Sequence, residues 1–117
     1  MRPQSCKAKG RRLQQEVRDA ILATFPGITA DDVRSTSMGA GGEDLLFSTH
    51  ARLMFPFSLE CKNVESLNIW KALEQAAGHG SRPPMVVFRR NNMPAHAALP
   101  FDLLLQLLLK AYFYDHP

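Results

Sequence analysis

The spacing of apolar residues alternates along the chain between a helical and an extended pattern, and this alternation restricts the fold more than any other feature. Over residues 9–25, apolar side chains recur at intervals of three and four, which is the stripe of an amphipathic helix that the Pro-Gly pair at 26–27 ends. A second helix is expected over 66–78, with Ser66 as its N-cap, and a third, strongly apolar helix over 100–114. The expected order of elements therefore begins and ends with a helix.

Short segments with strand character lie between these helices. In chain order they are 31–37, 44–48, 52–64, 83–90 and, least regular, 95–99. The second and third segments are close enough in sequence to form a hairpin, and Pro56 indicates a bulge or a sheet edge in the third. This order of elements predicts an α/β protein with a central mixed β-sheet flanked by helices.

The length of 117 residues suits a single domain, 1–117, whose residues 1–10 are expected to be a flexible basic leader. The cysteines, Cys6 and Cys61, provide neither a disulfide framework nor a metal-binding pair, and they fit a reducing compartment. The sequence has no apolar run of about 18 residues and no secretory signal. We therefore expect a soluble, cytoplasmic protein without a membrane partner.

Two charges interrupt a segment that otherwise has the pattern of a buried strand, "SLECKN". Because residues two apart lie on the same face of a strand, Glu60 and Lys62 project together, while Leu59 and Cys61 point to the opposite face. If the preceding strand pairs with this one, the Asp44 carboxylate can converge on Glu60. The sequence thus predicts two acids and a lysine in one polar patch.

Two carboxylates that lie close together repel and raise each other's pKa unless a divalent cation lies between them. Oxygen ligands suit Mg²⁺ or Mn²⁺ rather than Zn²⁺, for which the chain has no cysteine pair and no paired-histidine motif. A lysine beside such a cation can orient the attacking water, or supply positive charge to the phosphorane of phosphodiester cleavage. The patch therefore indicates a hydrolytic site for phosphodiesters.

Less specific interpretations of the same residues remain open. The Glu60 and Lys62 side chains could form an ion pair on an exposed edge strand, Asp44 could be a turn residue after the glycines, and Glu16 could be a solvated helix charge. The four histidines are scattered without ligand spacing and are assigned no chemistry. Trp70 is expected in the core.

The segments "GGEDLLFS" and "FSLECKN" resemble the PD-(D/E)xK nuclease superfamily, in which an aspartate opens one strand and Glu-x-Lys lies in the next. Within it, the chain is most similar to archaeal-type Holliday junction resolvases and small phage endonucleases, also through "RRLQQEVRDAIL", "RSTSMGAGGEDLL", "LEQAAG" and "PMVVFRR". The family's Pro-Asp is Glu43-Asp44 here, which leaves open whether Glu43 shares the metal. The resemblance implies a restriction-endonuclease-like core and a Mg²⁺-dependent endodeoxyribonuclease acting on branched DNA.

The resemblance also implies roles for individual residues. The implied metal ligands are Asp44, Glu60 and Glu16, which together with the catalytic lysine, Lys62, make up the catalytic set. The residues implied to lie near the scissile phosphate or the active centre are Ser35, Ser37 and Gln75.

The excess of basic residues near the N-terminus is consistent with a clamp on the DNA backbone, formed by Lys7, Lys9, Arg11 and Arg12. No feature of the sequence indicates specific contacts with DNA bases, so we expect the protein to recognise the shape of DNA and not its sequence. The apolar helix over 100–114 indicates either core packing or a homodimer interface. Two alternatives to a resolvase are a general or nicking phage-type endonuclease on duplex DNA and a non-catalytic DNA-binding module of the same fold.

Overall fold

The computed structural model describes residues 3–36 and 44–116, with side chains from Lys7 onward in the first range. The elements in chain order are α1 (Pro3–Thr24), a short 3-10 helix η1 (Ala30–Asp32), β1 (Val33–Ser35), β2 (Leu45–Phe47), α2 (Thr49–Met54), β3 (Ser58–Asn63), α3 (Ile69–Ala77), β4 (Pro84–Arg89), β5 (His96–Ala98) and α4 (Phe101–Asp115).

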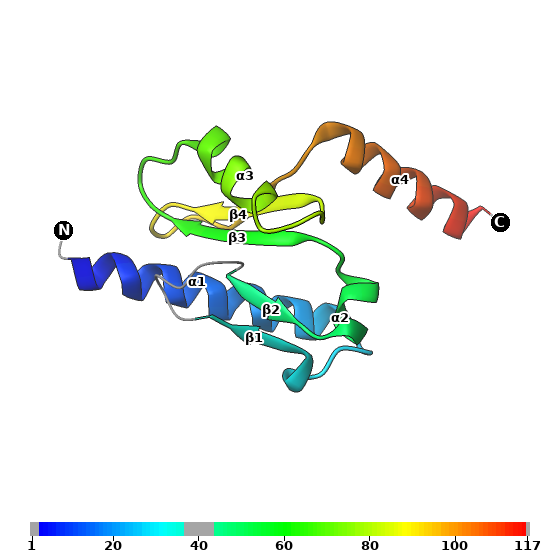
Figure 1. Cartoon of the computed structure of the whole chain (residues 1–117), viewed down its shortest axis with the longest axis horizontal. Coiled ribbons are helices and arrows are strands. Elements are labelled where there is room, and N and C mark those ends of the chain that lie inside the picture. The colour runs from blue at the N-terminus through cyan, green and yellow to red at the C-terminus, as the bar shows by residue number, and fades with distance from the viewer. Residues whose placement is uncertain (1–2, 37–43, 117) are drawn as a thin grey trace.

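Three strands form a mixed sheet in the order β3-β4-β5, in which β3 is parallel to β4 and β4 is antiparallel to β5. In Figure 1, α1 lies on one side of this sheet and α3 on the other. Among the described residues, two hydrophobic clusters fill these two interfaces. The described residues therefore form an α/β fold with a central mixed sheet packed against helices, as predicted.

The apolar stripe of α1 attaches this helix to the sheet. Leu13, Val17 and Ile21, at successive intervals of four, are buried in one cluster with Leu59 and Cys61 of β3. Full burial of one such side chain stabilises the fold by roughly 1.5–3 kcal/mol. Burial also raises the pKa of the Cys61 thiol, so this cysteine stays protonated and acts as a core residue.

Two helix starts differ from the expectation. α1 begins at Pro3 and takes in most of the segment 1–10, which was assigned to a flexible leader. α3 begins after Asn68 and not after Ser66, because the Asn68 side chain accepts a 3.1 Å hydrogen bond from the Lys71 backbone N–H.

α3 packs on the sheet through small side chains. Ala72 and Ala76 are buried against Val86 of β4, and the Ser58 hydroxyl donates a 2.6 Å hydrogen bond to the Ala76 carbonyl. Trp70 lies on the outer side of the helix and is 76% exposed, so its expected place in the core is wrong. The close approach of α3 to β3 positions the segment that follows the helix.

The strands β1 and β2 form an antiparallel hairpin that is separate from the central sheet. The strand expected over 52–64 is correct for its second half only. Its first half belongs to α2, because Ser48 caps this helix by accepting a 3.1 Å hydrogen bond from the Ala51 backbone N–H, and β3 begins at Ser58, after Pro56. The expected hairpin between 44–48 and 52–64 is therefore not formed.

Polar side chains tie the β1–β2 hairpin to the rest of the protein. Arg18 of α1 donates from Nε to the Val33 carbonyl at 2.7 Å and from Nη2 to the Ala30 carbonyl at 2.9 Å. The Ser48 hydroxyl donates to Asp32 at 2.7 Å, and this bond, with one from the Thr29 backbone N–H, lowers the pKa of Asp32. These bonds all lie at the end of the hairpin where β1 begins and β2 ends.

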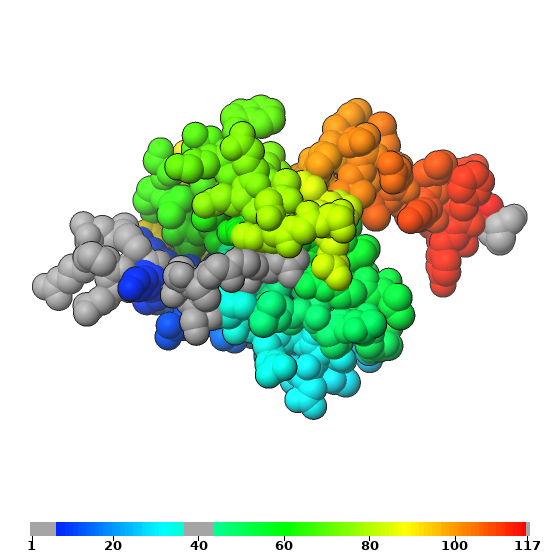
Figure 2. All heavy atoms as spheres, viewed as in Figure 1, coloured from blue at the N-terminus to red at the C-terminus, as the bar shows by residue number. Residues whose placement is uncertain are grey.

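α4 is the least integrated element. It follows β5 closely and projects from the body as a separate lobe, orange to red in Figures 1 and 2. None of its 15 residues, all of which the structure describes, is buried. Across the described ranges, no helix combines the length and the apolar character needed to cross a membrane. The helix expected over 100–114 therefore does not pack into the core.

Candidate active site

The polar patch lies on the face of β3 that α3 covers. Glu60 is in register with Val86 of β4 and is 6% exposed, which is unusual for a carboxylate unless its oxygens have partners. The Nζ of Lys62 lies 3.8 Å from Glu60 Oε2. The two charged side chains therefore share a face, as predicted, and the carboxylate of the pair is inside the protein and not on an open surface.

His79 supplies the second partner of Glu60. Its Nε2 forms a hydrogen bond with Glu60 Oε1, and the residue stands between Gly78, the C-cap of α3, and Gly80, whose φ is +144°. This backbone conformation is readily available to glycine. His79 was not predicted from the sequence because a lone histidine has no ligand spacing, and the flanking glycines were the one available signal. Each oxygen of Glu60 thus faces a nitrogen.

Asp44 reaches the same strand from the hairpin. Its backbone N–H donates a 3.3 Å hydrogen bond to the Leu59 carbonyl, and its Oδ2 accepts a 2.6 Å hydrogen bond from the Cys61 backbone N–H. These two bonds lie on the side of β3 away from β4, where the sheet ends. The charge of Glu60 is close enough to add to the rise that burial causes in the pKa of the Asp44 carboxyl, so the two acids converge on the same part of β3.

The environment of Asp44 disfavours its charged form. Burial raises the pKa of this carboxyl, and the charge of Glu60 adds to the rise, so the pKa reaches about 6; the Cys61 N–H and the charge of Lys62 act in the opposite direction. A cation between the two carboxyl groups would remove this repulsion.

The pair of carboxyl groups fits Mg²⁺, which proteins commonly hold through one or two carboxylates with water and phosphate oxygens completing the shell. Within residues 3–36 and 44–116, no group of three or more His, Cys, Asp or Glu side chains is arranged to hold a metal ion. The described residues therefore offer Asp44 and Glu60 as ligands and not a complete protein cage.

Glu16 lies on α1 with its carboxylate in an ion pair with Arg89 of β4. Its side chain is 52% exposed, and it does not form a ligand cluster with Asp44 and Glu60 in the described part of the chain. A metal-binding role of Glu16 stays a prediction.

A different residue of α1 reaches the hairpin that carries Asp44. Gln14 is 1% exposed, and its Oε1 accepts a 2.5 Å hydrogen bond from the Ser35 hydroxyl. The next residue, Thr36, donates from its backbone N–H and its hydroxyl to the Asp44 carbonyl, at 3.0 and 3.1 Å. Gln14 was not predicted from the sequence, where its signal was a polar residue next to Leu13 on the buried side of a helix.

A groove of about 290 Å³ runs between Lys62 and α3. Lys71 and Gln75, four residues apart on α3, line the groove together with Asn68, the N-cap of the helix. The structure therefore brings Gln75 to the same groove as Lys62, as the resemblance implied. The groove carries two amines and no carboxylate among its lining residues, which suits a phosphate backbone.

The predicted basic clamp lies on α1. Lys7, Arg11 and Arg12 are exposed, and Lys9 is half-buried, where its carbonyl accepts a 3.3 Å hydrogen bond from Asn63 at the end of β3. Two further predicted positions, Ser37 and Glu43, lie outside the described residues.

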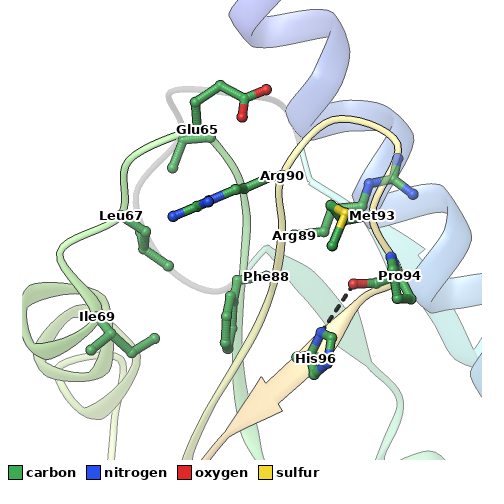
Figure 3. A pocket seen from close by; sticks show the side chains of 10 residues that line it. Glu65, Leu67, Ile69, Phe88, Arg89, Arg90, Met93, Pro94 and His96 are labelled. Carbon is green, nitrogen blue, oxygen red and sulfur yellow. Dashed lines mark hydrogen bonds between the residues drawn. The ribbon is translucent and has the colours of Figure 1, made fainter.

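A pocket of about 350 Å³ opens near the last residues of β3 and β4. Figure 3 shows the Arg90 side chain reaching across it, above Phe88 and Leu67. The ring of His96 lies 6.1 Å from that of Phe88, between centroids. An aromatic surface with a guanidinium above it is a surface on which a nucleobase can stack.

Comparison of the chain with protein-family models, curated proteins and solved structures found no match.

Proposed function

We propose that this protein is a metal-dependent endonuclease that hydrolyses phosphodiester bonds in branched DNA, with a restriction-endonuclease-like core. The observation that carries the proposal is the buried Glu60 with Lys62 beside it, close enough to Asp44 to affect the pKa of that carboxyl. A buried carboxylate that interacts with a second carboxyl group costs stability, and such arrangements are concentrated at functional sites. The resemblance to PD-(D/E)xK nucleases supports the same assignment.

Each residue of the cluster has a role in this proposal. Asp44 and Glu60 would hold Mg²⁺, or Mn²⁺ in its place, and the cation would supply positive charge to the phosphate oxygens and help to activate a water molecule. The Lys62 ammonium orients the attacking water and offsets the negative charge that develops on the phosphorane. His79 forms a hydrogen bond with the other carboxylate oxygen of Glu60, Oε1.

The DNA path follows from the positive charges around the site. Lys71 lines the α3 groove beside Lys62, the Arg90 side chain reaches across the neighbouring pocket, and further basic residues are exposed on α1, on the other side of the sheet (Figure 1). Contacts of this kind go to phosphates, which fix position without reading sequence. They support selection of DNA by shape, as expected of an enzyme for branched substrates.

Two rival functions share parts of this arrangement. A general or nicking endonuclease would use the same cluster on duplex DNA. A non-catalytic DNA-binding module is favoured by one observation, namely that both oxygens of Glu60 already have protein partners.

One experiment separates the three functions. Purified protein is incubated with a labelled four-way junction and with linear duplex of the same sequence, each in Mg²⁺ and in EDTA, alongside the near-isosteric variant Glu60→Gln. Mg²⁺-dependent cutting of the junction that the variant loses supports the proposal. Equal cutting of both substrates supports the general endonuclease, and binding without cutting supports the non-catalytic module.

A further inference from the structure

The exposed apolar surface of α4 has a regular pattern. Phe101, Leu105, Leu108 and Tyr112 are each at least half exposed, and they follow one another at intervals of four, three and four. This spacing is that of the seam between two paired helices. At about 100° per residue these four side chains form one face of α4, which we call the α4 seam, while the half-buried Leu103 and Leu107 lie on the opposite side.

Of the charged and amide side chains of α4, Asp115 continues the line of the α4 seam three residues after Tyr112, at the C-terminal end of the helix, and the other three lie off the seam. Asp102, Gln106 and Lys110 recur at intervals of four and form a narrow stripe along one flank of the helix. With Asp115, the helix carries two acids and one lysine, so it does not suit a polyanion. The exposed apolar surface of α4 is therefore suited to bind another protein surface and not DNA.

We propose that a second copy of this chain covers the α4 seam, with the two α4 helices packed antiparallel around a two-fold axis between Leu105 and Leu108. In this register, Phe101 of one copy meets Tyr112 of the other, and Leu105 meets Leu108 of the other. Each seam is thus complementary to itself, as a closed two-fold interface requires. The intervals of four, three and four read the same in both directions.

The size of the surface fits a dimer. The α4 seam and the flanking Leu109, which is more than half exposed, present on the order of 600 Å² of apolar surface per copy, compared with about 800 Å² per partner in a standard stable interface. The inference does not depend on the nuclease proposal. If that proposal holds, the two-fold axis relates two active sites, as symmetric cutting of two strands requires.

The first test is the mass of the protein in solution, measured by light scattering and analytical ultracentrifugation without DNA or metal. The wild type is expected to be a dimer at micromolar concentration. Leu108→Asp places a charge in the α4 seam twice per dimer and is expected to raise the dissociation constant by about 100-fold or more. Gln106→Asp adds the same charge on the polar stripe and should leave the dimer intact. A monomeric wild type, or equal behaviour of the two variants, would overturn the proposal.

The second test fixes the orientation of the helices. Phe101→Cys and Tyr112→Cys chains are prepared with Cys6→Ser, which leaves the buried Cys61 as the other cysteine. Oxidation of the mixed chains should give a cross-linked dimer, and oxidation of either chain alone should not. Cross-linking of the Phe101→Cys chain with itself would overturn the antiparallel arrangement. A far-ultraviolet circular dichroism spectrum of each variant, equal to that of the wild type, shows that the fold is kept.

Discussion

The Oδ2 atom of Asp44 accepts a 2.6 Å hydrogen bond from the backbone N–H of Cys61, so a carboxyl group of the hairpin is fastened to the strand that carries Glu60. The bond explains how two acids from different sheets meet without strand pairing between their segments. It also holds the Asp44 carboxyl in a half-buried position, where its charged form is disfavoured.

The first prediction concerns stability and pH in the absence of metal. Because the pKa of Asp44 is raised to about 6, its protonated form favours folding below pH 4, and this contribution is lost as the pH rises through 6. In EDTA, we expect the free energy of unfolding to fall over this range by on the order of 1 kcal/mol more in the wild type than in Asp44→Asn. Urea denaturation of both proteins at pH 4.5 and 7.5 measures this, and parallel pH profiles would contradict it.

The second prediction separates catalysis from binding. Lys62→Ala removes the ammonium group next to Glu60 and is expected to lower kcat by about 100- to 1,000-fold, with little change in DNA affinity. Lys71→Ala is the matched control, because Lys71 lines the same groove from α3 and is expected to weaken binding several-fold while kcat stays within about twofold. Single-turnover cleavage at saturating DNA and a titration in Ca²⁺ give the two quantities. Equal kcat for both variants would remove Lys62 from the chemistry.

The third prediction concerns His79 and the metal. The imidazole occupies Glu60 Oε1, so its removal in His79→Ala frees a carboxylate oxygen for a cation. We expect the Mg²⁺ concentration for half-maximal cleavage to fall by about 3- to 10-fold, with a loss of about 1–2 kcal/mol in stability from the missing hydrogen bond.

The control for this prediction is His79→Gln, which can still donate a hydrogen bond to Glu60 and should resemble the wild type in stability. Direct titration of Mn²⁺ by calorimetry gives the affinity independently of cleavage. Weaker Mn²⁺ binding in His79→Ala would mean that His79 helps to hold the metal and does not compete with it.

The fourth prediction concerns the hairpin. Arg18→Leu deletes the two hydrogen bonds to the carbonyls of Val33 and Ala30 and is expected to lower stability by about 1–3 kcal/mol. Because Asp44 depends on the hairpin for its position, kcat is expected to fall by about 10-fold or more even at temperatures where the variant is folded. Arg12→Leu, an exposed position on the same helix, should change stability by less than about 0.5 kcal/mol. Unchanged kcat in Arg18→Leu would show that the hairpin does not set the geometry of the site.

The central features of the fold could be predicted because periodicity records which face of an element is buried. The stripe of Leu13, Val17 and Ile21, the strand with Glu60, and β4 all followed from this pattern. α2 could not be predicted, because its N-cap at Ser48 competes with the strand character of the apolar residues that follow it. In a segment this short, one N-cap hydrogen bond can favour a helix even where the residues have a preference for a strand.

The candidate site could be predicted along one strand but not between elements. Spacing alone put Glu60 and Lys62 on one face, whereas the contacts of His79 and Gln14 depend on where α3 and α1 lie against the sheet. For the same reason, spacing did not show that Glu16 points toward Arg89. Helix residues two apart, such as Gln14 and Glu16, face different directions, and tertiary packing selects between them.

Asp44 also has a consequence for solubility. β3 is the outer strand of its sheet, and Asp44 occupies two backbone groups along its free edge, the Leu59 carbonyl and the Cys61 N–H. Unoccupied groups on an outer strand are a template for pairing with another molecule, which is how ordered aggregates begin. Asp44→Ala keeps the backbone hydrogen bond to the Leu59 carbonyl but frees the Cys61 N–H, so it should become turbid on warming sooner than Glu60→Gln, although both lose an acid from the same cluster. The Asp44 side chain would then both reduce self-association through the edge of the sheet and contribute a carboxyl group to the candidate site.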